Sequence, residues 1–199
     1  MIETIQLIAK NILTVIYEQT GFALVIAILF MFAFMHAEEH GIKQTVKKWL
    51  EGFRRETKFR RVFVLAFYLA MLTIHTLLNR EMYVNPLEKI MSGWGIYDEN
   101  GQFTTQAVEN VILFIPMTSL LFWSFGKDIL KRGFCFDGII SKGVLISAGA
   151  SLIIEFLQLF LRVGTLQFAD FCYNTLGGLI GSLIYWCGYK LIHRNKKEQ

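Results

Sequence analysis

Residues 151–181 read SLIIEFLQLFLRVGTLQFADFCYNTLGGLIG, and this stretch decides the fold of the chain. Two apolar runs flank a short polar link, and each run contains ionisable or amide side chains. These polar positions are Glu155, Gln158, Arg162, Asp170 and Asn174. The first three share one face of a helix, and the last two share one face of the next helix. Charged groups are costly within a membrane, so a hairpin whose polar ends meet indicates a functional site.

Small residues follow the polar positions of the second run. Gly177, Gly178 and Gly181 continue the stripe of Asp170 and Asn174, where they would let two helix backbones approach closely. We interpret these three glycines as packing residues. Pro116, in an earlier apolar run, is expected to bend its helix or to free a backbone carbonyl for another partner.

The composition indicates a membrane protein. Of 199 residues, 54% are hydrophobic and 18% are charged, and the mean hydropathy is +0.44, which is too apolar for an ordinary soluble domain. We therefore expect an all-α integral membrane protein in which residues 1–199 form a single domain.

Hydropathy predicts about five transmembrane helices and two further helices. The expected spans are residues 18–36, 62–79, 109–125, 139–161 and 170–192. Residues 2–16 have an amphipathic pattern, which we interpret as an interfacial helix in preference to the tilted start of the first span. Residues 42–56 alternate bases with apolar positions, as in a surface helix on an anionic leaflet. The alternative for this second segment is a solvated basic loop.

The distribution of bases predicts the topology. Sixteen of the 20 Lys and Arg residues lie in residues 43–61, 127–142 and 190–197, which alternate with the other connections. The positive-inside rule then predicts a multi-pass protein of the cell membrane with its N-terminus outside and its C-terminus in the cytoplasm.

This topology places the intramembrane polar residues in the outward-facing half. The candidate ligand-binding residues are Arg80, Asn110, Glu155, Gln158, Arg162, Asp170 and Asn174. A purely structural alternative remains open, in which the amides join helices by hydrogen bonds and Arg162 neutralises Glu155 or Asp170. The excess of ionisable groups over what helix packing requires favours a site.

The spacing of these residues resembles the VanZ-like family of small bacterial membrane proteins. The pattern is Glu155, Gln158 and Arg162 followed by Asp170, Asn174, Gly177 and Gly181. Weaker matches are Asn110-VILF-Ile115-Pro116, Thr76-LLNR and Val84-Asn-Pro, so the resemblance covers roughly residues 62–189. The sequence has Met117-Thr118 where the family usually has Leu-Gly.

The resemblance implies resistance to teicoplanin or related lipoglycopeptides. We expect an outward-facing polar pocket that binds an amphiphile, either the drug or a lipid-linked cell-wall precursor, with membrane lipids as further partners. The alternative is an intramembrane enzyme on a lipid-linked substrate, with Glu155 or Asp170 as catalytic base. A small transporter is a third hypothesis, which the scarcity of polar residues in the inner half disfavours.

One other motif suggests metal chemistry. His36-Ala-Glu-Glu39-His40 matches the inverted zinc-protease pattern, but no third ligand follows it. We therefore interpret it as a charge cluster at the end of a span and expect no metal or cofactor. The basic residues suit membrane lipid, and we expect no nucleic-acid partner.

Overall fold

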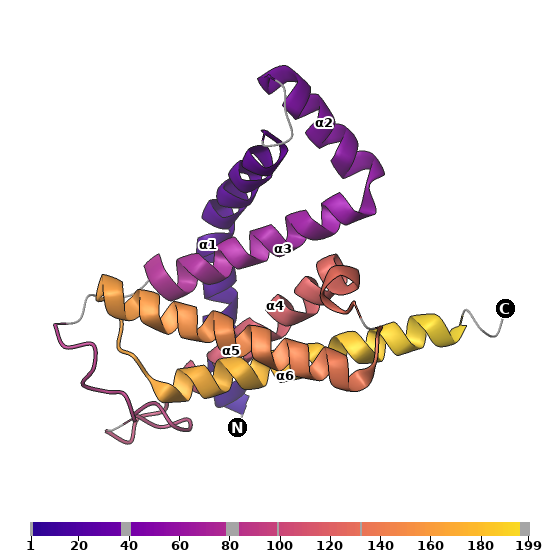
Figure 1. The fold of residues 1–199 in the computed structure, drawn as a ribbon. Helices are drawn as coiled ribbons and strands as arrows, with labels where there is room; N and C mark the ends of the chain where they lie inside the picture. Colours follow the sequence, from indigo (N-terminus) through magenta and orange to yellow (C-terminus); the bar gives the residue numbers. More distant parts are fainter. Residues whose placement is uncertain (1, 37–40, 79–83, 99, 132, 196–199) are drawn as a thin grey trace.

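The computed structural model describes residues 2–36, 41–78, 84–98, 100–131 and 133–195. Its regular elements are the helices α1 (Ile2–His36), α2 (Ile42–Arg55), α3 (Thr57–Thr73), η1 (Ile74–Leu78), α4 (Gln106–Ile129), α5 (Phe136–Leu161) and α6 (Phe168–Asn195). The described residues contain one isolated β-bridge, between Tyr97 and Phe103, and no strand. The expected all-α class is therefore confirmed (Figure 1).

Three of the described helices are long and apolar enough to cross a membrane. They are Thr57–Leu77, Gln106–Ile129 and Phe136–Leu161, which have 21, 24 and 26 residues. About 20 residues span a hydrocarbon core of ~30 Å. Large apolar side chains such as Leu145, Ile153 and Phe160 on α5 are exposed, as suits a lipid-facing surface. These long apolar helices indicate a membrane protein, and the total of five spans stays a prediction.

α1 is one uninterrupted helix, so the amphipathic segment 2–16 and the expected span 18–36 are parts of the same element. No proline lies between them to end the first segment. The side chain of Asn11 donates a hydrogen bond to Thr105 Oγ1 at 3.0 Å and another to Glu109 Oε1 at 3.5 Å. The amphipathic segment is therefore tied to the beginning of α4. A shorter apolar run, Ala23–Met35, lies in the second half of α1.

The basic segment is helical over Ile42–Arg55, which excludes a solvated loop. Its Trp49 ring stacks on Phe32 of α1 at 6.1 Å and lies edge-on to Phe59 and Phe63 of α3, both at 6.3 Å. These aromatic contacts join α2 to its two neighbours. The position of α2 on a lipid surface stays a prediction.

The helices α4, α5 and α6 pack closely because α6 presents glycine to both of its neighbours. A Cβ on Gly177 would come within 2.9 Å of Phe114 Cβ and would overlap the Val111 carbonyl oxygen. A Cβ on Gly181 would overlap the Ile115 carbonyl oxygen, and one on Gly178 would overlap the Ser147 hydroxyl. The backbones of α4 and α6 can therefore lie in direct contact.

Pro116 does not end α4, which runs through it from Gln106 to Ile129. One turn before the proline, the hydroxyl of Tyr68 on α3 donates to the Leu113 carbonyl at 2.6 Å. Proline has no N–H, so it disturbs the hydrogen bonding of the turn that precedes it. The Tyr68 hydroxyl is a donor from the neighbouring helix beside that turn.

Candidate functional site at the hairpin end of the bundle

Two loops meet at one end of the bundle, on the left of Figure 1, and they form the setting of the site. One loop precedes α4, and the other joins α5 to α6. Their backbones are joined because Leu166 N–H donates to the Pro86 carbonyl and Phe168 N–H donates to the Ile90 carbonyl, both at 2.9 Å. The N–H of Gly95 donates to the Tyr173 hydroxyl at 2.8 Å. The α5–α6 hairpin is thereby fixed against the loop before α4.

Glu155 and Asp170 are brought to this end and linked through two glutamines. Both acids are buried, with 5% and 4% of their surface exposed. The Gln167 N–H donates to Glu155 Oε2 at 3.1 Å. Gln106 Nε2 lies 3.0 Å from Gln167 Oε1 and 3.0 and 3.1 Å from the two Asp170 oxygens. The first residue of α4 therefore connects the carboxylates of α5 and α6.

Gln158 connects the same hairpin to α3. Its side chain is buried and donates from Nε2 to the Thr76 carbonyl at 2.8 Å. Thr76 lies in η1, a π-helical turn at the end of the third helix, where backbone carbonyls lose their intrahelical partners. The Gln158 amide satisfies one of them, so this residue has a clear role in packing.

Asn174 and Asn110 lie one turn further into the bundle, and both are buried. Asn174 Nδ2 donates to the Ser151 hydroxyl at 2.9 Å, which joins α6 to α5. Asn174 Oδ1 and Asn110 Nδ2 have no hydrogen-bond partner among the residues that the structure describes. Buried amide atoms usually have partners, so these two mark the interior of the site as able to take further hydrogen bonds.

Arg162 lies apart from the buried residues. α5 ends at Leu161, and Arg162 follows in the left-handed conformation, with φ of 56°. Its side chain is exposed and forms no ion pair with a residue that the structure describes. Because the helix ends one residue before Arg162, Arg162 does not share the helical face of Glu155 and Gln158.

Two of the predicted features lie wholly or partly outside the described residues. Arg80 is one of them, and residues 37–40 of the candidate zinc motif are the other. Glu109, at the same end of the bundle, accepts hydrogen bonds from Thr105 and Asn11.

Sequence reasoning missed Gln106 and Gln167, which hold the two carboxylates. Both lie outside the expected spans, in predicted connections. Polar residues are common in connections, so their polarity did not indicate a functional site. Their importance follows from the folding of three separate segments to one place.

The arrangement is suited to binding by hydrogen bonds and charge. Two carboxylates can accept hydrogen bonds, amides can donate or accept them, and an exposed guanidinium stands at the rim. A family model for VanZ/LLP1 matches residues 20–192 of the sequence.

The chain belongs to the VanZ/LLP1 family.

The VanZ/LLP1 match confirms the resemblance and extends it to residues 20–61, which lie outside the part of the sequence that resembles the family by its motifs. The comparisons with curated proteins and with solved structures returned no match. At the departure from the usual Leu-Gly, Thr118 is fully buried and shares a hydrogen bond of 2.8 Å with the Ser147 hydroxyl. The added hydroxyl of this family member therefore joins α4 to α5.

Proposed function

We propose that this VanZ/LLP1 protein binds an amphiphile at the hairpin end of the bundle and thereby contributes to resistance to teicoplanin or related lipoglycopeptides. The ligand is the drug itself or a lipid-linked cell-wall precursor. Family membership and the long apolar helices support a role in the membrane. The resistance role comes from the family resemblance.

In this proposal five spans cross the bacterial cell membrane, with the N-terminus outside and the C-terminus in the cytoplasm. The site and the described end of α6 lie at opposite ends of the bundle (Figure 1). The three base-rich segments are those that the positive-inside rule assigns to the cytoplasm. The site then faces outward, where lipid-linked precursors and lipoglycopeptides are found.

The observation that carries the proposal is the pair of buried carboxylates, Glu155 and Asp170, joined through Gln167 and Gln106. Keeping two carboxylates in an apolar bundle is costly, and neutral residues of similar volume would pack the same helices more cheaply. Their presence is explained if they accept hydrogen bonds from a ligand. The exposed Arg162 would bind an anionic group of that ligand at the rim, and Arg80 would be a second base.

The test replaces each carboxylate by its amide. We expect Glu155→Gln and Asp170→Asn to reduce protection against teicoplanin by about tenfold or more, the effect of losing one charge-assisted hydrogen bond. The measurement is the minimum inhibitory concentration in a susceptible host, with membrane abundance determined by immunoblot.

Glu88→Gln is the matched control, because Glu88 is an exposed acid in the loop before α4. It should leave protection unchanged. Full protection by both amide variants at normal abundance would refute the proposal.

A further inference from the structure

A cleft that the proposed function does not use lies at the opposite end of the bundle. α3 and α6 both pack against α4, and within the described residues the backbones of α3 and α6 do not come close to each other. The space between them is a cleft of about 810 Å³ with α4 as its floor. It opens at the beginning of α3 and the ends of α4 and α6, away from the hairpin end.

The lining of the cleft combines bases with apolar and aromatic surface. Lys58, Arg61 and Lys127 line it together with a single carboxylate, Asp128. Lys58 Nζ lies 3.6 Å from Asp128 Oδ2, so this carboxylate is already engaged. Leu120, Phe122, Trp123, Phe134 and Ile192 supply the apolar part of the lining. The excess of positive charge beside an apolar wall suits an anionic amphiphile.

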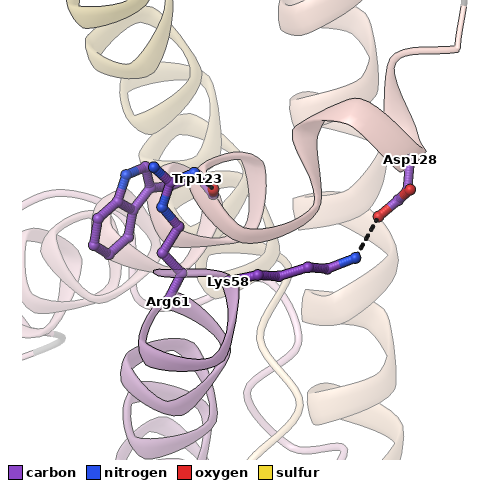
Figure 2. A network of polar contacts seen from close by, with 4 residues as sticks. All are labelled: Lys58, Arg61, Trp123 and Asp128. Carbon is purple, nitrogen blue, oxygen red and sulfur yellow. Dashed lines mark hydrogen bonds and ion pairs between the residues drawn. The ribbon is translucent and has the colours of Figure 1, made fainter. Parts of the chain in front are cut away.

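Arg61 is held in place with donor capacity to spare. Its Cζ lies 5.0 Å from the centroid of the Trp123 ring, and Nη1 donates to the Trp123 carbonyl at 3.2 Å. Figure 2 shows this guanidinium beside the Trp123 ring, while Lys58 extends to Asp128. The Arg61 Nε atom is buried and finds no hydrogen-bond partner within the described part of the chain. A guanidinium fixed this way is preorganised for a phosphate.

Ser124 provides an independent indication of a ligand. This residue lines the same cleft, is 9% exposed and has a buried hydroxyl with no hydrogen-bond partner in the described ranges of the chain. Serine within a helix ordinarily bonds to a carbonyl of the preceding turn, as Ser141 does here with Asp137. A buried hydroxyl without a partner is costly, and a phosphate oxygen in the cleft would remove that cost.

We propose that this cleft binds the phosphate group of an anionic phospholipid, with Arg61 and Ser124 as ligands and the acyl chains along the apolar wall. The cleft lies at the end of the bundle that the base distribution assigns to the cytoplasmic leaflet. Binding there would join α3 to α6 through the lipid, at a place where the described backbones of these two helices are apart. The inference is independent of the site at the hairpin end.

The experiment measures thermal stability of the purified full-length protein in detergent after addition of phosphatidylglycerol, phosphatidylcholine or inorganic phosphate. We expect phosphatidylglycerol to raise the melting temperature and the other two additions to have little effect. Equal stabilisation by both lipids would overturn the proposal. Stabilisation by inorganic phosphate as large as that by phosphatidylglycerol would show a soluble anion site and would also overturn it.

Variants assign the effect to the cleft. Arg61→Ala should weaken phosphatidylglycerol binding about tenfold or more, because a charge-assisted hydrogen bond is lost. Lys48→Ala removes the same charge from an exposed position on α2 and should leave binding unchanged. Equal losses in both variants would show non-specific charge attraction and would refute the assignment.

Ser124→Ala provides a second test of the cleft if Arg61→Ala does not fold. Without lipid this variant should be as stable as the parent protein or more stable, because the hydroxyl it lacks has no partner. With phosphatidylglycerol it should gain less stability than the parent protein. An equal gain in both proteins would exclude the Ser124 hydroxyl as a ligand.

Discussion

At the scale of single residues, hydroxyls and amides join the helices of the hairpin end and of the bundle interior. The bonds between Thr118 and Ser147 and between Asn174 and Ser151 each cross from one helix to another. In lipid such bonds contribute about 0.6 to 2 kcal/mol, because the unfolded helices also find partners. They fix the relative positions of α4, α5 and α6 more than they stabilise the fold.

Thr118→Val tests this role. We expect it to lower the free energy of unfolding by about 0.6 to 2 kcal/mol, measured by titration with denaturing detergent, because the bond to Ser147 is lost. Thr175→Val is the matched control, since the Thr175 hydroxyl donates to the Phe171 carbonyl of its own helix. Similar losses in both variants would contradict an interhelical contribution.

Arg162 permits a test that separates backbone conformation from ligand binding. A residue other than glycine in the left-handed conformation carries a backbone cost of about 1 kcal/mol, and glycine removes it. Arg162→Gly should therefore raise the melting temperature of the protein while it reduces teicoplanin protection. A variant that is more stable and fully protective would show that the guanidinium has no part in the site.

At the scale of elements, the close approach of α4 and α6 depends on glycine. Gly177→Ala should destabilise the protein by about 1 to 3 kcal/mol, the usual cost of overpacking, because its Cβ would overlap the Val111 carbonyl oxygen. Detergent unfolding would measure the loss.

Gly149→Ala is the control for helix propensity. Gly149 lies on α5, and a Cβ there would have no atom within 4 Å. Alanine at this position should leave stability unchanged or raise it by up to about 1 kcal/mol. If Gly177→Ala were as stable as Gly149→Ala, the close packing of α4 on α6 would be wrong.

At the scale of the whole molecule, the proposed orientation can be measured with the native thiols. Cys135 is exposed and immediately precedes α5, at the end assigned to the cytoplasm. In a variant with Cys172→Ser and Cys187→Ser, a membrane-impermeant maleimide should label Cys135 in inverted vesicles and not in intact cells.

The opposite labelling is expected for the loop before α4. A cysteine at the exposed position of Glu88, in a variant without the native cysteines, should react in intact cells. Labelling of Cys135 in intact cells together with protection of the Glu88→Cys thiol would reverse the topology and would place the hairpin site on the cytoplasmic side.

The sequence by itself determined the helical class, the positions of most helices and the family. Long apolar runs must form helices in lipid because every backbone hydrogen bond has to be satisfied internally. The basic helix was predicted at residues 42–56 and extends over Ile42–Arg55. The spacing of Glu155 to Gly181 was enough to suggest the VanZ-like family, which the family match confirms.

The tertiary structure alone decided which polar residues meet. Periodicity places Arg162 on the face of Glu155, but the helix ends at Leu161, and Arg162 is exposed in a left-handed conformation. Gln106 and Gln167 join the carboxylates because loop hydrogen bonds fix the α5–α6 hairpin to the start of α4. The cleft between α3 and α6 also arises from packing between helices distant in sequence. Such contacts depend on how the helices associate, whereas hydropathy and periodicity describe each helix separately.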